Sequence, residues 1–227
     1  MPRFSPVYEL LWWTGIGPTC RTALVFHGVD SSATSPVQMA KLLTYLDRSP
    51  DLATNVTVHF DDAYETITPW VTELASRDVT VTVFVSTDIV GTEYMGRRVC
   101  DWPQLGELSL HPNVSIQSHA ASHTNLTRLE LSEVESELRR SKEQLEKRVG
   151  APVMEIAYPR GKYNSNIVRI ASECGYSQGW TVDNGHLGCA ASSRLTLPRI
   201  VAQPRESMAS VVGRSRRATC LIQRLRR

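Results

Sequence analysis

Short apolar runs alternate with amphipathic segments along most of the chain. The runs predict seven strands, at 23–26, 56–60, 79–85, 114–118, 153–157, 178–182 and 195–201. Apolar residues at helical spacing predict helices at 36–46, 64–77, 103–108, 129–149, 164–174 and 206–212. Strands that alternate with helices indicate a parallel α/β sheet, and seven strands without a break in composition favour one barrel over two domains.

Local sequence signals indicate where some of these elements begin, end or bend. The helix at 129–149 carries Ser132 and Glu135 in the spacing of a capping box, and Gly150 follows as a stop signal. Pro69 within the segment 64–77 predicts a boundary or a kink. Residues 88–101 have no periodic pattern and are expected to form a loop.

Polar residues follow the predicted strands repeatedly. They come after Phe26, Phe60, Ser118, Ala157 and Val182. In α/β barrels the carboxyl ends of the strands meet at one end of the barrel, where the active site lies. We therefore expect these polar clusters to form a single site.

The strand at 56–60 runs into two adjacent carboxylates, Asp61 and Asp62. Two like charges at one strand end repel each other unless a cation lies beside them. His119 and His123 follow another strand, at a spacing that suits a metal ion. One carboxylate and two imidazoles leave positions open on Zn²⁺ or a similar ion, as catalytic sites require.

Such an ion lowers the pKa of a bound water towards roughly 7 and polarises a carbonyl oxygen. The second carboxylate can then act as general base, which suits hydrolysis of an amide or ester. His27, at a different strand end, is the candidate general acid. Backbone N–H groups near Tyr64 are candidates for holding the oxyanion.

Each of these features also has a purely structural interpretation. Adjacent aspartates often cap helices, and a four-residue histidine spacing is frequent by chance. The segment Tyr158-Pro159-Arg160-Gly161 alone reads as a turn. Their occurrence together, each at a strand end, favours the functional interpretation.

Composition excludes several other classes of protein. The net charge of +2 gives no field directed at nucleic acid, and no apolar run approaches the roughly 18 residues of a membrane span. Five cysteines without a CxxC pair, and no signal peptide, favour a soluble cytoplasmic protein with reduced thiols. We expect one domain over residues 1–227, ending in a basic tail at about 214–227 that is solvated; the alternative is a terminal helix packed on the barrel.

Taken in order, three segments resemble the NodB-type polysaccharide deacetylases, carbohydrate esterase family 4. They are Phe60-Asp61-Asp62-Ala63-Tyr64, the stretch 118–126 and Ala157-Tyr158-Pro159-Arg160-Gly161. The resemblance extends from about residue 26 to residue 201. It implies a distorted (β/α)7 barrel that removes acetyl groups from N-acetylated sugars with a divalent metal, first of all Zn²⁺, with Co²⁺, Ni²⁺ and Mn²⁺ as alternatives.

Carried over by position, the resemblance implies a role for each matching residue. Asp61 corresponds to the catalytic base, and the metal ligands are Asp62, His119 and His123. His27 resembles the general acid of the circularly permuted branch, which includes bacterial poly-N-acetylglucosamine deacetylases. The implied substrate-binding residues are Tyr64, Tyr158, Pro159 and Arg160, with Trp180 and Asp183 on a strand that walls the acetyl pocket or orients the base.

The sequence also departs from the family pattern. Ala63 replaces the usual Gly, and Arg160 stands where this branch often has Tyr or Asn, which points to a groove for something anionic or differently shaped. His59 is expected to share a pleat face with Asp61 and to support it, or to be an ordinary interior histidine.

The function that follows is a metal-dependent N-deacetylase of an amino-sugar substrate. The absence of a leader favours a small soluble glycoside or biosynthetic intermediate. The alternatives are a polymer such as poly-N-acetylglucosamine, a chitin-like glycan or peptidoglycan, and a non-sugar cyclic amide or imide. A non-catalytic binder is a further alternative, which the intact set of acids and imidazoles disfavours.

Overall fold

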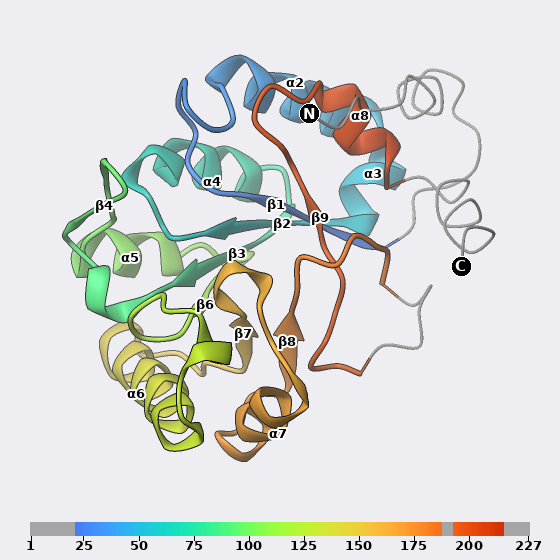
Figure 1. The fold of residues 1–227 in the computed structure, drawn as a ribbon. Coiled ribbons are helices and arrows are strands. Elements are labelled where there is room, and N and C mark those ends of the chain that lie inside the picture. Colours follow the sequence, from blue (N-terminus) through green and yellow to red (C-terminus); the bar gives the residue numbers. More distant parts are fainter. Residues whose placement is uncertain (1–20, 188–192, 216–227) are drawn as a thin grey trace.

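Seven parallel strands form one curled sheet in the computed structural model, which describes residues 21–187 and 193–215 (Figure 1). Every pair of neighbouring strands is parallel, in the order β8-β7-β6-β3-β2-β1-β9. The strands are β1 (Thr22–Phe26), β2 (Val56–Asp61), β3 (Thr80–Val85), β6 (Val114–Ser118), β7 (Glu155–Ala157), β8 (Gln178–Trp180) and β9 (Ile200–Val201). The predicted fold, a distorted (β/α)7 barrel, is confirmed.

Residues 194–201 connect the two edges of the curled sheet. The Gly179 N–H donates to the Arg194 carbonyl at 2.9 Å, and Leu197 N–H donates back to the Gly179 carbonyl at 2.7 Å. The chain then pairs with β1 through Ile200 and Val201. The predicted strand at 195–201 is therefore regular only at its last two residues, because the segment changes partner strand at Pro198, which has no N–H to donate.

Helices cover the outer face of the sheet (Figure 1). They are α2 (Pro36–Arg48), α3 (Pro50–Asn55), α4 (Thr68–Ala75), α5 (Trp102–Ser109), α6 (Leu131–Val149), α7 (Ser165–Glu173) and α8 (Met208–Gly213). Four single 3-10 turns join them: η1 (Glu65–Ile67), η2 (Thr87–Ile89), η3 (Leu126–Arg128) and η4 (Pro159–Gly161). The helix α3 has no counterpart among the sequence predictions.

Some local predictions are confirmed and others need correction. The boundary predicted near Pro69 is confirmed, because helix α4 begins at Thr68, not at residue 64, and Pro69 lies in its first turn, where the missing N–H costs nothing. The capping box of α6 joins Glu130 and Glu133, two residues earlier in the chain than the pair predicted from sequence. The segment 88–101 contains a small hairpin, β4 (Glu93–Tyr94) and β5 (Arg97–Arg98).

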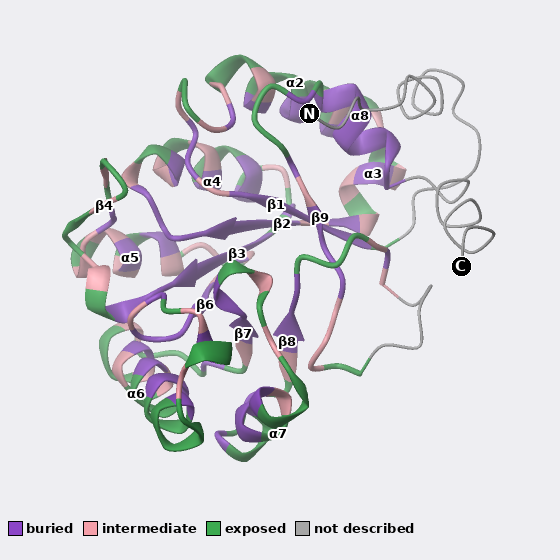
Figure 2. Cartoon of the chain, viewed as in Figure 1, coloured by how far each residue is buried: buried purple, intermediate pink, exposed green. Residues whose placement is uncertain are grey.

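The sheet is buried on both faces, as Figure 2 shows. Its outer face packs against the helices. Its inner face encloses a small cluster in which Phe84 and Trp180 are buried together with Ala157. His59 lies among them, with its ring centroid 5.2 Å from that of Phe84 and 4.6 Å from that of Trp180.

His59 makes the stability of the protein depend on pH. Burial, helped by the nearby Arg199 guanidinium, lowers the pKa of His59 to about 3. An unfolded histidine has a pKa near about 6.5, so the unfolded chain binds the extra proton first and stability falls as the pH drops from 6.5 towards 3. We expect the metal-free wild type to lose roughly 2 kcal/mol through His59 between pH 7 and pH 5.

Urea denaturation of wild type and His59→Gln at both pH values measures this loss. The variant is expected to lose less stability than the wild type over that interval. The matched control is His111→Gln, because His111 lies at a half-buried position outside the barrel interior. Equal losses in wild type and His59→Gln would contradict the assignment.

The segments beyond the barrel are described only in part. Cys100 and Cys174 are buried free thiols, whereas Cys20, Cys189 and Cys220 lie outside the described residues. Arg214, the first residue of the predicted basic tail, is buried and donates to Glu206 at 2.8 Å. Residues 216–227 lie outside the described part of the chain. Among the described residues, no helix has both the length and the apolar character that crossing a membrane requires.

Candidate active site

The carboxyl ends of the strands enclose a cavity of about 290 Å³. Asp61 is the last residue of β2, and His27 directly follows β1. His119 directly follows β6. The structure therefore brings the twin acids and the histidines together, as the strand-end pattern predicts. The cavity is lined by His27, Asp61, Asp62, Tyr94, Met95, His119, His123, Arg160, Gly161 and Val182.

Three side chains converge on one point of this cavity. The Asp62 Oδ1 lies 3.1 Å from His123 Nε2 and 3.7 Å from His119 Nε2. One ligand atom from each residue lies within 4.8 Å of the other two. All three side chains are nearly buried, and what remains exposed of them lines the cavity.

The hydrogen bonds of the imidazoles fix which nitrogen faces Asp62. His119 Nδ1 donates to the Ala157 carbonyl at 2.7 Å, so its Nε2 carries the lone pair. Burial lowers the pKa of His119 and keeps the ring neutral. His123 Nδ1 contacts the Tyr94 hydroxyl at 2.7 Å, which leaves Nε2 to face the carboxylate.

A lone pair that faces an anionic oxygen is unfavourable unless a cation lies between them. Among the buried side-chain atoms of the described residues, Asp62 Oδ1 has no hydrogen-bond partner. The donor set therefore fits a divalent metal ion, with Asp62, His119 and His123 as its ligands. The contacts of both Nδ1 atoms are those that orient metal-bound histidines in proteins.

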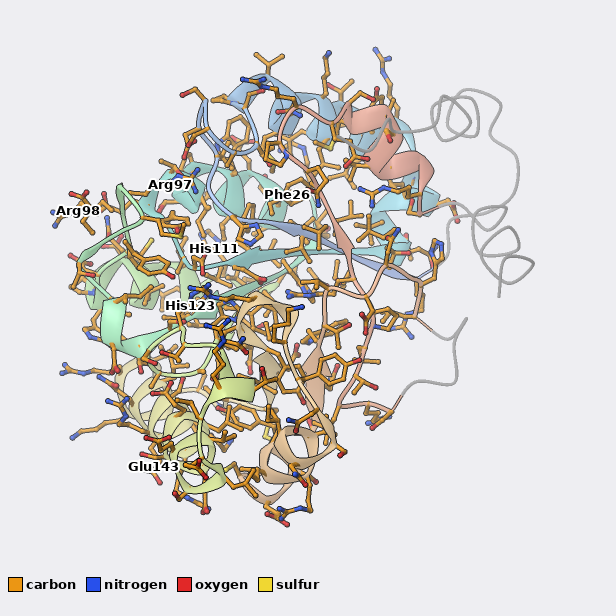
Figure 3. All side chains as sticks on the ribbon, in the orientation of Figure 1. Phe26, Arg97, Arg98, His111, His123 and Glu143 are labelled. Carbon is orange, nitrogen blue, oxygen red and sulfur yellow. The ribbon has the colours of Figure 1, made fainter. Side chains whose placement is uncertain are left out.

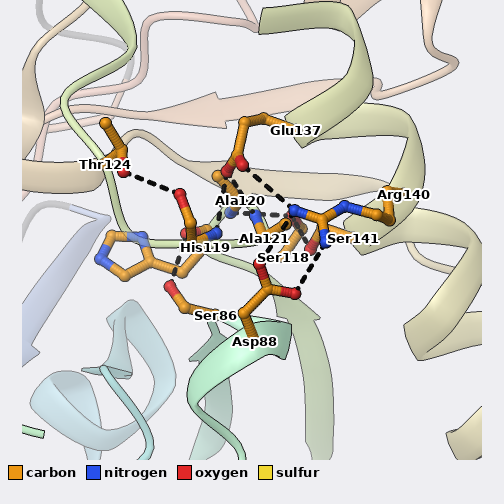
Figure 4. Close-up of polar contacts among 11 residues, drawn as sticks. Ser86, Asp88, Ser118, His119, Ala120, Ala121, Thr124, Glu137, Arg140 and Ser141 are labelled. Carbon is orange, nitrogen blue, oxygen red and sulfur yellow. Dashed lines mark hydrogen bonds and ion pairs between the residues drawn. The ribbon is translucent and has the colours of Figure 1, made fainter. Parts of the chain in front are cut away.

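Helix α6 holds the loop between the two histidines in place (Figure 4). The Glu137 carboxylate accepts hydrogen bonds from the backbone N–H groups of Ala121 and Ser122, at 3.1 and 2.8 Å. Arg140 in turn donates to Glu137 and, through two nitrogens, to Asp88. A buried carboxylate thus satisfies backbone donors that the tight loop leaves unpaired.

Asp61 forms a buried ion pair with Arg199. Two guanidinium nitrogens donate to its two carboxylate oxygens, at 2.8 and 2.9 Å, and Arg199 Nε donates to the Thr181 carbonyl at 2.9 Å. Arg199 is 0% exposed. Burial alone would raise the pKa of Asp61, but Arg199 and the nearby His119 together outweigh it and hold that pKa well below its usual range.

Arg199 is the main feature of the site that the sequence did not reveal. Each oxygen of Asp61 still has a free lone pair after accepting from the guanidinium, so Asp61 stays ionised, fixed in orientation and able to accept one further bond. A signal was present: Arg199 directly precedes the apolar pair Ile200-Val201. A charge at the start of a buried strand needs a buried partner.

The other residues predicted to bind substrate take different positions. Tyr64 is buried beneath Arg97, whose guanidinium lies 5.0 Å from the ring centroid, and burial raises the pKa of Tyr64 to about 12. Tyr158 is buried, and its hydroxyl donates to the Leu195 carbonyl at 2.9 Å. Neither side chain lines the cavity.

Three more residues that were predicted to bind substrate do not line the cavity. Pro159 is buried. Trp180 lies in the barrel interior and donates from Nε1 to Glu155 at 2.7 Å. Asp183 is exposed and accepts a 2.7 Å hydrogen bond from the Tyr163 hydroxyl. Arg160, by contrast, lines the cavity directly.

The β4–β5 hairpin supplies two lining residues that the sequence did not suggest, Tyr94 and Met95. Met95 is 77% exposed at the turn. In Figure 3, His123 lies inward of Arg98, which projects from the outer edge of the same hairpin. No sequence signal marked these residues, since their segment has no periodic pattern.

Ala63 adopts the left-handed conformation that the usual Gly would favour. Its φ is 51°, and that of Asp62 is 69°. A non-glycine residue in this region costs of order 1 kcal/mol, and such strain concentrates at functional sites. The small methyl group of Ala63 is accommodated within the core.

The fold and the site define a hydrolase-like α/β barrel with a candidate metal centre. Residues 49–179, more than half of the chain, match the family model described as "Polysaccharide deacetylase". The chain belongs to the polysaccharide deacetylase family. The matched segment contains the twin acids, both histidines and Arg160.

Individual relatives are more distant. YxkH of Bacillus subtilis (strain 168), which carries a polysaccharide deacetylase name, is 32% identical over 82 residues, covering 36% of this chain and 29% of YxkH. The deacetylase PplD of Streptococcus pyogenes, solved with acetate, has a TM-score of 0.73 at 22% identity and covers 87% of this chain and 99% of PplD. IcaB from Ammonifex degensii has a TM-score of 0.73 at 21% identity, with 87% and 98% covered. Both structures support the fold.

Proposed function

We propose that this protein is a metal-dependent N-deacetylase that hydrolyses the acetamide of an amino sugar. The observation that carries the proposal is the pairing of two carboxylates with different partners. Asp62 faces the imidazoles of His119 and His123, whereas Asp61, one residue away, is held ionised by Arg199. Neighbouring acids in environments that differ in this way suit one metal ligand and one base.

Asp62, His119 and His123 would hold the metal. Their nitrogen and oxygen donors suit Zn²⁺, and Co²⁺, Ni²⁺ or Mn²⁺ are the alternatives. A divalent ion bound there supplies Lewis-acid polarisation of the acetyl carbonyl and lowers the pKa of coordinated water.

The remaining residues supply the proton transfers. Asp61 accepts a proton from the attacking water while the water oxygen bonds to the acetyl carbon. His27 lines the same cavity and donates a proton to the departing amine when the C–N bond breaks. The products are acetate and the free amino sugar. The place of His27, after the first strand of the described chain, supports membership of the circularly permuted branch.

The substrate is an N-acetylated amino sugar, either small or part of a longer glycan. A second cavity of about 230 Å³ also includes His27 in its lining, together with Arg97 and Gln203. His27 therefore lies between two adjoining hollows. This arrangement favours the second candidate, a glycan of more than one residue, because neighbouring sugars would have room beyond the reacting one.

Acetate release tests the function directly. Purified protein is stripped with a chelator, reloaded with Zn²⁺ and incubated with N-acetylglucosamine, its oligomers, peptidoglycan fragments and cyclic amides. Ring opening of the cyclic amides, which frees no acetate, is followed by chromatography. We expect acetate only from N-acetylated sugars, loss of at least about 100-fold in rate after chelation, and recovery on adding metal. Hydrolysis of the cyclic amides alone, or an unchanged rate without metal, would overturn the proposal.

A further inference from the structure

Arg160 lies on a rigid turn at the edge of the active-site cavity. It follows the buried residues Tyr158 and Pro159 and has the left-handed dihedral angles φ 58° and ψ 14°. Gly161 follows with φ 65°, and a Cβ at that position would lie 2.1 Å from a methyl carbon of Val182. The turn is thus packed tightly against its neighbour, which fixes the base of the Arg160 side chain.

The Arg160 guanidinium has no acidic partner within the described residues. The acids near it are already engaged. Asp61 pairs with Arg199, and Asp62 faces the two imidazoles. Asp183, on the neighbouring segment, accepts from Tyr163. Arg160 is therefore an exposed cation that lines a concave site and has no partner of its own there.

Other cations around the site differ from Arg160. Arg97, at the adjoining hollow, pairs with Asp30 at 3.0 Å and lies over the Tyr64 ring. Lys162 is exposed only two residues from Arg160 but does not line the cavity. Only Arg160, among these three, combines a free charge with direct access to the reacting groups.

The reacting acetamide is neutral, so it can accept a hydrogen bond from a guanidinium but offers it no negative charge for an ion pair. A guanidinium binds carboxylate and phosphate groups through two parallel hydrogen bonds, and a concave site strengthens its field. We propose that Arg160 binds an anionic substituent, a carboxylate or a phosphate, carried by the N-acetylated sugar or by the residue next to it. The inference rests on the proposed deacetylase function and makes Arg160 a specificity-determining residue.

The test compares three matched substrates. They are an oligomer of N-acetylglucosamine, the same oligomer with a lactyl ether carboxylate, and the same oligomer with a phosphate ester. The quantity measured is the ratio of kcat/KM for each charged substrate to that for the neutral one. We expect a wild-type ratio of at least about 10, and a fall of about 10- to 100-fold in Arg160→Ala, mainly through KM, the loss typical of one charge-assisted hydrogen-bonded pair.

Two further variants separate direct binding by the Arg160 guanidinium from the effect of any positive charge near the cavity. Arg160→Lys keeps the charge but not the two-pronged geometry and is expected to retain part of the ratio. Lys162→Ala removes an equal charge two residues away and is expected to leave the ratio unchanged. Calorimetric binding of the same oligomers to protein without added metal provides a readout independent of turnover. The carboxylate and phosphate substrates show which of the two anions is preferred.

The outcomes distinguish the two proposals. Acetate release without preference for either charged substrate, or an Arg160→Ala ratio equal to that of the wild type, overturns the inference and leaves the deacetylase function intact. If no N-acetylated sugar yields acetate with metal present, the proposed function itself fails.

Discussion

Replacing Asp61 by asparagine is expected to lower kcat by about 10²- to 10⁴-fold, the range typical of losing a general base. The amide has the size of the carboxylate but cannot take a proton from water. Metal affinity is expected to change little, because Asp62, His119 and His123 form the candidate ligand set without Asp61. Steady-state acetate release gives the rate, and titration with Co²⁺, followed by its absorbance, gives the affinity. A variant that loses metal binding together with turnover would contradict the role of base.

The same substitution is expected to destabilise the fold. Arg199 would keep its buried charge after losing the partner that accepts from two of its nitrogens. Removing one member of a buried pair typically costs about 3–5 kcal/mol. A double variant, Asp61→Asn with Arg199→Met, serves as the control. Urea denaturation of the four proteins should show that the double variant loses clearly less stability than the two single losses combined.

Replacing Arg199 by methionine is the second change with a large expected effect. In this variant no guanidinium offsets the effect of burial, which raises the pKa of a carboxyl group. The pKa of Asp61 is therefore expected to rise. The base then becomes protonated at a higher pH, so the acidic limb of the kcat/KM profile moves upward and activity at low pH falls first. The unpaired buried carboxylate also costs stability, again about 3–5 kcal/mol at neutral pH.

Arg199→Lys separates charge from geometry. Lysine keeps a positive charge near Asp61 but cannot donate to both oxygens and to the Thr181 carbonyl at once. We expect its pH profile to lie between those of the wild type and Arg199→Met. A methionine variant with an unshifted acidic limb would show that Arg199 only supports the fold.

Much of the site could be predicted from the sequence because it depends on strand ends. Asp61, His27 and His119 directly end or follow apolar runs, and the parallel topology brings such ends together. The resemblance to a family added roles to these positions. The exposure of side chains near the site could not be predicted in this way: Tyr158 and Trp180, predicted to bind substrate, are buried, and each donates a hydrogen bond within the protein.

The sequence by itself determined which strands end in polar residues, and therefore which elements carry the acids and the imidazoles. The tertiary structure alone decided their partners. Arg199 reaches Asp61 across 138 positions of sequence, and Tyr94 reaches His123 across 29. Contacts of this kind depend on how the sheet curls and where an irregular segment crosses it. Local periodicity reports which residues are buried along one element, and it does not report which residues from distant elements meet.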